Sequence, residues 1–188
     1  MSDSNGKILI HICCAPCAIF PIMSLKEQGY QVNGLFFNPN IHPSSEFDKR
    51  KESLTKYQEI MKMKIEYVDV CDVSTWRKFD NTDDRCDYCY RLRLEYLFEY
   101  ASRNGYKLVT TSLLVSPYQK HEFIRKIGEE LSEKYDIKFF YQDFRVGFWE
   151  GRTIAKSLGL YLQKYCGCII SRELREIELF KKGKTLDD

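Results

Sequence analysis

No stretch of this chain approaches the run of roughly 18 apolar residues that a membrane-spanning helix needs. The amino-terminal segment MSDSNGKILIHICC carries one lysine and a short apolar stretch that runs straight into cysteines, unlike a secretory signal. We therefore expect a cytoplasmic protein without a membrane partner.

The sequence also lacks a marked excess of charge. Its 29 lysines and arginines nearly balance its 27 aspartates and glutamates, so overall charge does not predict a partner. No G-x-G-x-x-G follows a predicted strand, which argues against a bound nicotinamide or flavin dinucleotide. No repeat, low-complexity tract or linker divides the chain, and its 188 residues suffice to bury a core without disulfide bonds. We expect a single domain spanning residues 1–188.

Short apolar runs alternate with amphipathic segments along the chain. Strands are predicted at 7–12, 32–37, 65–70, 108–111 and 138–141, and helices at 17–28, 45–63, 84–103, 119–135, 148–158 and 171–182. This alternation predicts an α/β fold, a Rossmann-like parallel sheet with helices on both faces and a helical carboxyl-terminal part. In such sheets, ligands bind at the carboxyl ends of the strands.

Two of the predicted helices carry specific expectations. In the second, Ser45 followed by Asp48 resembles a capping box. The apolar stripe of the same helix is formed by Phe47, Leu54, Tyr57, Ile60 and Met61. In the helix at 84–103, one apolar face is formed by Leu94, Leu97, Phe98 and Ala101.

Seven of the eight cysteines fall in three groups: Cys13, Cys14 and Cys17; Cys86 and Cys89; Cys166 and Cys168. The first group follows a strand at the start of a helix, where the peptide dipole and free N–H groups lower thiol pKa values. The second pair is spaced to share one side of a helical turn. In the third, the intervening glycine allows a turn tight enough for both sulfurs to face the same side. All seven are candidate metal ligands.

Three chemistries fit these groups, since a cytoplasmic location disfavours disulfides. A closed zinc site needs four thiolates, as in a zinc-stapled RNA-binding module. The C-x-x-C of Cys14 and Cys17 is typical of thioredoxin-like thiol-disulfide oxidoreductases, although it explains only the first group. A four-iron cluster takes four thiolates and leaves three for a second metal or a reactive thiol. Cys71 stands alone, and we expect it to be a small buried apolar residue.

Five motifs extend this interpretation. They are HICCAPC at 11–17, FFNPNIHPSSEFDKR at 36–50, DDRCDYCYRLRL at 83–94, TTSLLVSPYQKH at 110–121 and YLQKYCGCIISR at 161–172. In this order they resemble the motif set of the QueH-type epoxyqueuosine reductases over residues 9–172. The predicted sheet is also similar to that of the adenine nucleotide alpha hydrolase-like (HUP) proteins. Cys13 to Cys17 replace the glycine-rich phosphate loop of those proteins, so ATP use is not implied.

The resemblance implies a tRNA-modifying oxidoreductase that reduces epoxyqueuosine in the anticodon loop to queuosine, the last step of queuosine biosynthesis. It further implies a 4Fe-4S cluster beside a separately coordinated, mononuclear iron, with metal-binding insertions at 84–93 and 161–172. We expect Cys86, Cys89, Cys166 and Cys168 to serve mainly the cluster, and Cys13, Cys14 and Cys17 to face the second iron. The zinc module and the thiol-disulfide oxidoreductase are the alternatives.

This reaction removes an oxygen as water and consumes two electrons and two protons. Because no flavin motif is present, an external carrier such as ferredoxin or flavodoxin should supply the electrons. The expected catalytic residues are Cys13 and Cys14 at the second iron and, as proton donors by position, Tyr118 and Lys120.

Substrate-binding residues are expected on two further segments. An extruded base is usually held by aromatic and amide side chains, a role that suits Phe37, Asn38 and Asn40 at the end of the second strand. Arg91 and Arg93 follow the second cysteine pair and are expected to contact phosphates of the anticodon arm. The basic run that contains Arg50 is a further candidate. Helical spacing alone does not decide whether Trp149 belongs to the core.

Overall fold

The computed structural model describes residues 6–79 and 82–186. Five strands form one parallel sheet in the order β3-β2-β1-β4-β5. Their bounds are β1 Lys7–His11, β2 Gln31–Phe37, β3 Ile65–Val68, β4 Leu108–Thr111 and β5 Lys138–Phe139. The central strand β1 pairs through Ile10 with Gly34 of β2 and with Thr110 of β4. The prediction of an α/β, Rossmann-like parallel sheet is confirmed.

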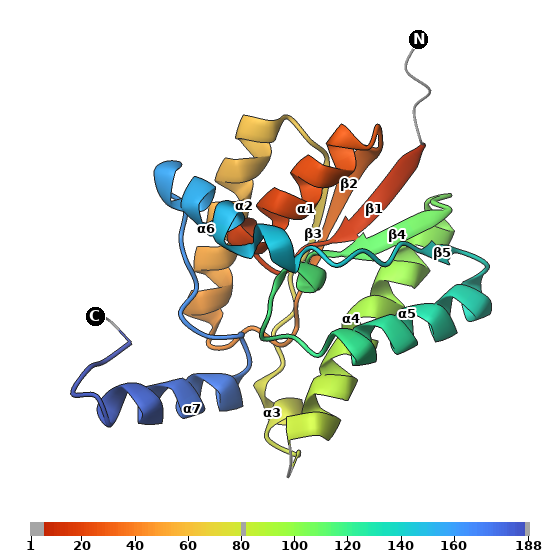
Figure 1. Cartoon of the computed structure of the whole chain (residues 1–188). Helices are drawn as coiled ribbons and strands as arrows, with labels where there is room; N and C mark the ends of the chain where they lie inside the picture. Colours follow the sequence, from red (N-terminus) through yellow and green to blue (C-terminus); the bar gives the residue numbers. More distant parts are fainter. Residues whose placement is uncertain (1–5, 80–81, 187–188) are drawn as a thin grey trace.

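The helices are α1 Ala15–Glu27, α2 Ser44–Met61, α3 Val73–Trp76, α4 Thr82–Arg103, α5 His121–Tyr135, α6 Phe148–Ser157 and α7 Ile169–Phe180, with 3-10 turns η1 Ser112–Val115 and η2 Arg145–Gly147. Figure 1 shows α1, α2 and α6 on one side of the sheet and α4 and α5 on the other. Right-handed crossovers between parallel strands produce this arrangement. In the same view, α3 and α7 lie beyond the carboxyl ends of the strands.

Burial explains why these segments adopt their elements. Ile8, Leu9 and Ile10 of β1 are fully buried, as expected for a parallel strand covered by helices on both faces. The predicted apolar face of α4 is also fully buried, at Leu94, Leu97, Phe98 and Ala101. Among the described helices, none combines the length and the apolar composition that crossing a membrane requires.

Two expectations for α2 are wrong. The helix begins at Ser44, Pro43 occupies the N-cap position, and no side chain caps the helix. Ser45 therefore falls within the first turn, so it does not form the expected capping box with Asp48. Ile60 is 51% exposed, because at about 3.6 residues per turn it lies to one side of the face that contains Leu54 and Tyr57.

Other differences concern short segments. Helix α3 was not predicted; its N-cap is Asp72, whose Oδ1 accepts hydrogen bonds from the backbone N–H groups of Ser74 and Thr75 at 3.1 and 3.3 Å. Cys71 is exposed, contrary to expectation. Strand β3 ends at Val68, so Cys71 lies in a loop and not in the buried strand.

The sheet order fixes where a ligand site can form. After β1 the chain passes to α1 on one face, and after β4 it passes through η1 to α5 on the other. The neighbouring carboxyl ends of β1 and β4 are therefore a topological switch point, where open α/β sheets bind ligands. The first cysteine group and the segment 112–118 both lie here.

Candidate metal centre

Three buried thiols lie together where β1 passes into α1. The Sγ atoms of Cys13, Cys14 and Cys17 are all within 4.8 Å of one another, and those of Cys13 and Cys14 are 3.7 Å apart. Cys14 is the N-cap residue of α1 but makes no capping bond through its side chain. All three side chains are free thiols, so their sulfurs remain available to an additional ligand.

Burial makes full ionisation of this group unfavourable without a compensating cation. Hydrogen bonds from Cys14 and Cys17 lower the pKa of Cys13. Burial raises the pKa of Cys14, and the hydrogen bond to Cys13 raises that of Cys17. A bound metal ion would reverse the cost, because thiols lose their protons when they become ligands.

The remaining grouped cysteines form a second set. Cys86 and Cys89 lie in the first turns of α4, and Cys168 is the N-cap residue of α7. Cys89 and Cys168 are buried in one small cluster with Trp76. The pKa of Cys89 is raised to about 12, mainly by burial; the charge of Arg93 opposes this rise, and negative charge at Cys166 and Cys168 adds to it.

The two sets differ in how closely their sulfurs approach. Across residues 6–79 and 82–186, the triad of Cys13, Cys14 and Cys17 is the only group of three or more potential ligand side chains that lies this close together. Among the four cysteines of the second set, no three sulfurs all lie within 4.8 Å of one another, although charge at Cys86, Cys166 and Cys168 acts on the pKa of Cys89.

Two buried arginines lie beside the sulfurs. Arg50 lies on α2, and its Nη1 and Nη2 donate to the carbonyl oxygens of Cys166 and Tyr165 at 3.0 and 2.9 Å. Its Nε forms an ion pair with Glu46 at 2.7 Å. Arg93 lies on α4, and its Nε donates to the carbonyl oxygen of Cys89 at 3.1 Å. Its Nη2 is buried without a hydrogen-bond partner among the described residues.

Both arginines line a cavity of about 860 Å³ that three of the cysteines also line, namely Cys13, Cys17 and Cys166. Two side-chain amides approach sulfurs here: Gln163 donates to Cys17 Sγ at 3.3 Å and Gln119 to Cys166 Sγ at 3.4 Å. Such N–H···S bonds stabilise thiolates and tune the potentials of iron-sulfur centres. The cavity therefore combines thiols, amide donors and positive charge.

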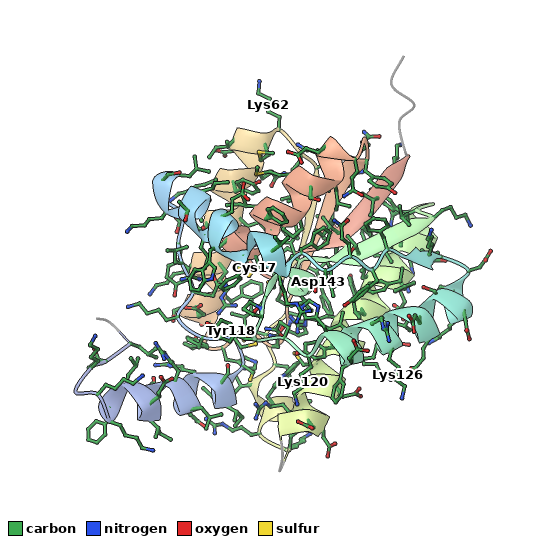
Figure 2. The ribbon with its side chains drawn as sticks, viewed as in Figure 1. Cys17, Lys62, Tyr118, Lys120, Lys126 and Asp143 are labelled. Carbon is green, nitrogen blue, oxygen red and sulfur yellow. The ribbon has the colours of Figure 1, made fainter. Side chains whose placement is uncertain are left out.

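The expected catalytic residues of the loop after β4 lie at different distances from the cavity. Tyr118 lines it and is 77% exposed. Figure 2 shows Tyr118 and Cys17 in the central part of the molecule, whereas Lys62 and Lys126 point outward. Lys120 is not among the lining residues and forms an ion pair with Asp83. The Tyr90 hydroxyl fixes this loop to α4, because it accepts from the Lys120 backbone N–H at 3.1 Å and donates to Gln119 at 2.8 Å.

The expected base-binding residues lie in the interior and do not line the cavity. The ring of Phe37 stacks on Tyr96, with centroids 3.9 Å apart. Asn38 donates to the Ile12 carbonyl at 2.8 Å, while its Oδ1 has no partner in the described part of the chain. Asn40 is buried, and a Cβ atom at Gly167 would lie 3.2 Å from its Nδ2.

The expected phosphate-binding arginines differ from each other. The Arg91 side chain is 41% exposed and forms ion pairs with Glu130 at 2.9 Å and Asp87 at 3.8 Å. Arg93 is buried inside the cavity, 2% exposed, and Arg50 is likewise internal. Arg93 and Arg50 therefore lie beside the cysteines and not on the outer surface.

Sequence reasoning missed several residues of the site: Gln119, Phe148, Arg152 and Gln163 line the cavity, and Ser112 contacts Cys13. Ser112 bridges the two strand ends, since its Oγ accepts from the Cys13 backbone N–H at 3.1 Å and lies 3.4 Å from Cys13 Sγ. Ser112, Gln119 and Gln163 lie within two of the five motifs, which could have indicated them, whereas Phe148 and Arg152 lie outside all five.

Comparisons with known proteins bear on the whole chain. The family model described as "Epoxyqueuosine reductase QueH" matches residues 8–174. A protein of that name from Thermotoga maritima is 32% identical, with 94% of this chain and 97% of that protein covered. Another from Dehalococcoides mccartyi is 35% identical, with coverages of 95% and 97%.

A solved structure shows the same fold at much lower identity. It is titled as a predicted subunit of tRNA methyltransferase from Methanocaldococcus jannaschii, and it matches with a TM-score of 0.50 at 12% identity. The match covers 96% of this chain and 90% of that one. At this identity the likeness concerns the fold alone.

Proposed function

The chain belongs to the epoxyqueuosine reductase QueH family, and from this premise we propose that it reduces epoxyqueuosine in the anticodon loop of tRNA to queuosine. The observation that carries the proposal is the buried thiol triad of Cys13, Cys14 and Cys17 at the switch point of the sheet, next to a cavity that two of its members line. A redox site for a large substrate needs both reactive ligands and an adjoining space.

The donor set fits iron-sulfur chemistry. Thiolates are the ligands of iron-sulfur clusters, and the described chain offers seven grouped thiols beside two buried arginines. We propose that Cys86, Cys89, Cys166 and Cys168 hold a 4Fe-4S cluster and that Cys13, Cys14 and Cys17 hold an adjacent mononuclear iron. When bound, the cluster would supply electrons one at a time. The mononuclear iron would supply a Lewis acid for the epoxide oxygen.

The domain organisation follows the same assignment. We propose one domain in which residues 84–93 and 161–172 are metal-binding additions to the sheet. The first contains the start of α4, and the second contains the loop before α7. Arg50 holds the second addition against α2 through its two carbonyl contacts.

The chain's own residues have separate tasks in this proposal. Arg93 stabilises negative charge on the sulfurs, because its guanidinium is buried beside them. Burial lowers the pKa of Arg93, but negative charge at Cys89, Cys166 and Cys13 raises it. Tyr118 donates a proton from its phenol oxygen to the departing oxygen, and Lys120 supports it from the loop edge. Reduction of the epoxide to the alkene takes two electrons and two protons and releases one water.

Partners and location follow from the chemistry. The substrate is tRNA, and electrons come from a low-potential carrier such as ferredoxin or flavodoxin. We propose that the reaction takes place in the cytoplasm, where cysteines remain reduced.

The test is metal and sulfide analysis of protein purified without oxygen, paired with conversion of epoxyqueuosine-containing tRNA under a chemical reductant. We expect about four sulfides and about five irons per chain. Cys86→Ala should lose the sulfide and the activity, whereas the matched variant Cys71→Ala should retain both, because Cys71 is exposed and lies outside the grouped cysteines. Stoichiometric zinc without sulfide would contradict the proposal.

A further inference from the structure

Two large aromatic side chains lie exposed at the edge of the cysteine cavity. Trp149 is 69% exposed and Tyr118 is 77% exposed, and both line the cavity. Phe148 lies between them: its ring centroid is 5.0 Å from that of Trp149 and 5.9 Å from that of Tyr118, both in edge-to-face geometry. We call Tyr118, Phe148 and Trp149 the aromatic rim.

The backbone that carries the rim is held firmly against the helix of Cys17. A Cβ atom at Gly151 of α6 would lie 3.0 Å from the carbonyl oxygen of Pro16 in α1. At Gly147, just before Phe148, a Cβ atom would lie 1.9 Å from the ring of Phe20. Close packing of α6 on α1 therefore fixes two members of the rim, Phe148 and Trp149, relative to the helix that carries Cys17.

Positive charge lines the cavity beside the rim. The guanidinium of Arg152 lies 5.8 Å from the Phe148 ring centroid and forms no ion pair with a described residue. Within the described chain, the charged residues lining the cavity are one glutamate, Glu178, and six cations: Arg50, Arg93, Arg152, Lys164, Arg175 and Lys184. This charge complements a polyanion.

We propose that the aromatic rim stacks on unpaired nucleotides that flank the target nucleotide, with Trp149 as the main stacking surface and Arg152 as its phosphate contact. The proposal rests on the proposed function. Exposed aromatic rings beside cations are how proteins bind single-stranded nucleic acid, since every base offers a ring face for stacking. The neighbours of an extruded loop nucleotide are unstacked and available.

The test measures binding and stacking without chemistry. The intact metal-loaded protein is titrated into an RNA hairpin that corresponds to an anticodon stem-loop and carries 2-aminopurine beside the target position. We expect the wild type to quench 2-aminopurine fluorescence. Trp149→Ala should weaken binding about 10-fold or more and abolish most of the quenching, whereas Trp149→Phe should retain most of both.

Two further variants complete the design. Arg152→Gln should weaken binding and reduce its dependence on salt. Phe180→Ala is the matched control, because Phe180 is 82% exposed but does not line the cavity; it should bind as the wild type does.

The outcomes separate this inference from the proposed function. If the wild type does not bind the hairpin, the assignment of a tRNA substrate fails. If the wild type binds and Trp149→Ala binds and quenches equally well, only the stacking role is overturned. A Trp149→Ala variant with unchanged RNA binding but a raised KM for flavodoxin would make the rim a protein-docking surface and would also overturn the inference.

Discussion

Arg50 and Arg93 are both buried beside cysteines, yet their surroundings give them different roles. Arg50 uses all three of its guanidinium nitrogens within the protein, on Glu46, Tyr165 and Cys166. Arg93 has one nitrogen, Nη2, without a partner in the described chain. A buried donor left unpaired costs free energy, so Arg93 is suited to a ligand in the cavity, whereas Arg50 organises the protein.

Removing the Arg50 guanidinium should destabilise the fold. We expect Arg50→Met to lower the free energy of unfolding by about 3–5 kcal/mol, because Glu46 would keep a buried charge without its partner. The Tyr161 hydroxyl, which donates to Glu46 at 2.6 Å, would compensate only in part. Urea unfolding followed by circular dichroism, with metal content measured in each preparation, checks this.

The double variant Glu46→Gln/Arg50→Met is the control for this prediction. It removes both charges and should recover much of the lost stability. If Arg50→Met and the double variant are equally destabilised, the unpaired carboxylate is not the cause.

Tyr118 is the residue whose chemical role is most easily isolated. Tyr118→Phe keeps the ring of the aromatic rim but removes the phenol, so we expect kcat to fall roughly 100-fold while KM for the tRNA stays unchanged. Steady-state kinetics of tRNA reduction measure both. An unchanged kcat would remove Tyr118 as the proton donor and transfer that assignment to Lys120, to be tested by Lys120→Met.

Among the elements, those that were predicted match within a few residues, and those without a prediction are short. Strand β4 has its predicted bounds, and α4 and α6 differ from theirs by one or two residues. Helix α3 and the two 3-10 turns have too few residues to show a periodicity. Strand β5 has only two paired residues, Lys138 and Phe139, and the last backbone hydrogen bond to β4 is donated by the Phe140 N–H to the Val109 carbonyl oxygen at 2.7 Å.

The contact between α5 and β5 depends on a glycine. A Cβ atom at Gly128 would lie 2.3 Å from Cδ1 of Phe139. In an isolated helix, alanine is more favourable than glycine by about 1 kcal/mol. Overpacking a core, however, lowers the free energy of unfolding by roughly 1–3 kcal/mol. We therefore expect Gly128→Ala to lower the free energy of unfolding by up to about 2 kcal/mol, as measured by urea unfolding.

A compensating substitution tests the cause. Leucine in place of Phe139 removes the ring that opposes the new methyl group. The double variant Gly128→Ala/Phe139→Leu should therefore lose less free energy of unfolding than the two single variants lose in sum. Strict additivity would show that the ring is not what opposes the new methyl group.

At the scale of the whole molecule, neutral buried histidines couple stability to pH. His42 is fully buried, and its Nδ1 accepts a hydrogen bond from the Ile169 N–H at 3.1 Å, at the start of α7. Burial lowers the pKa of His42; the charge of Arg77 lowers it further, while that of Asp72 raises it. Burial likewise lowers the pKa of His121. The folded protein therefore resists protonation that the unfolded chain accepts.

Stability should accordingly fall with acidification. The contribution of His42 is fully present above the pKa of an unfolded histidine, about 6.5, and decreases as the pH falls below it, by at most about 1.4 kcal/mol per pH unit. Urea unfolding at about pH 7.5 and about pH 5.5 measures this. His42→Gln, which cannot take up a proton, should show a smaller decrease, and an identical decrease would exclude His42 as a contributor.

Local periodicity, residue spacing and motifs are enough to predict the alternating elements, the parallel α/β class, the three cysteine groups and the family. They do not predict that Arg50 and Arg93 lie inside with the cysteines, that Phe37 stacks on Tyr96 away from the cavity, or that Trp149 is exposed. Local sequence carries no information on which distant segments meet. The strand order β3-β2-β1-β4-β5 brings residues 13 and 112 together, and that order is set by packing over the whole chain.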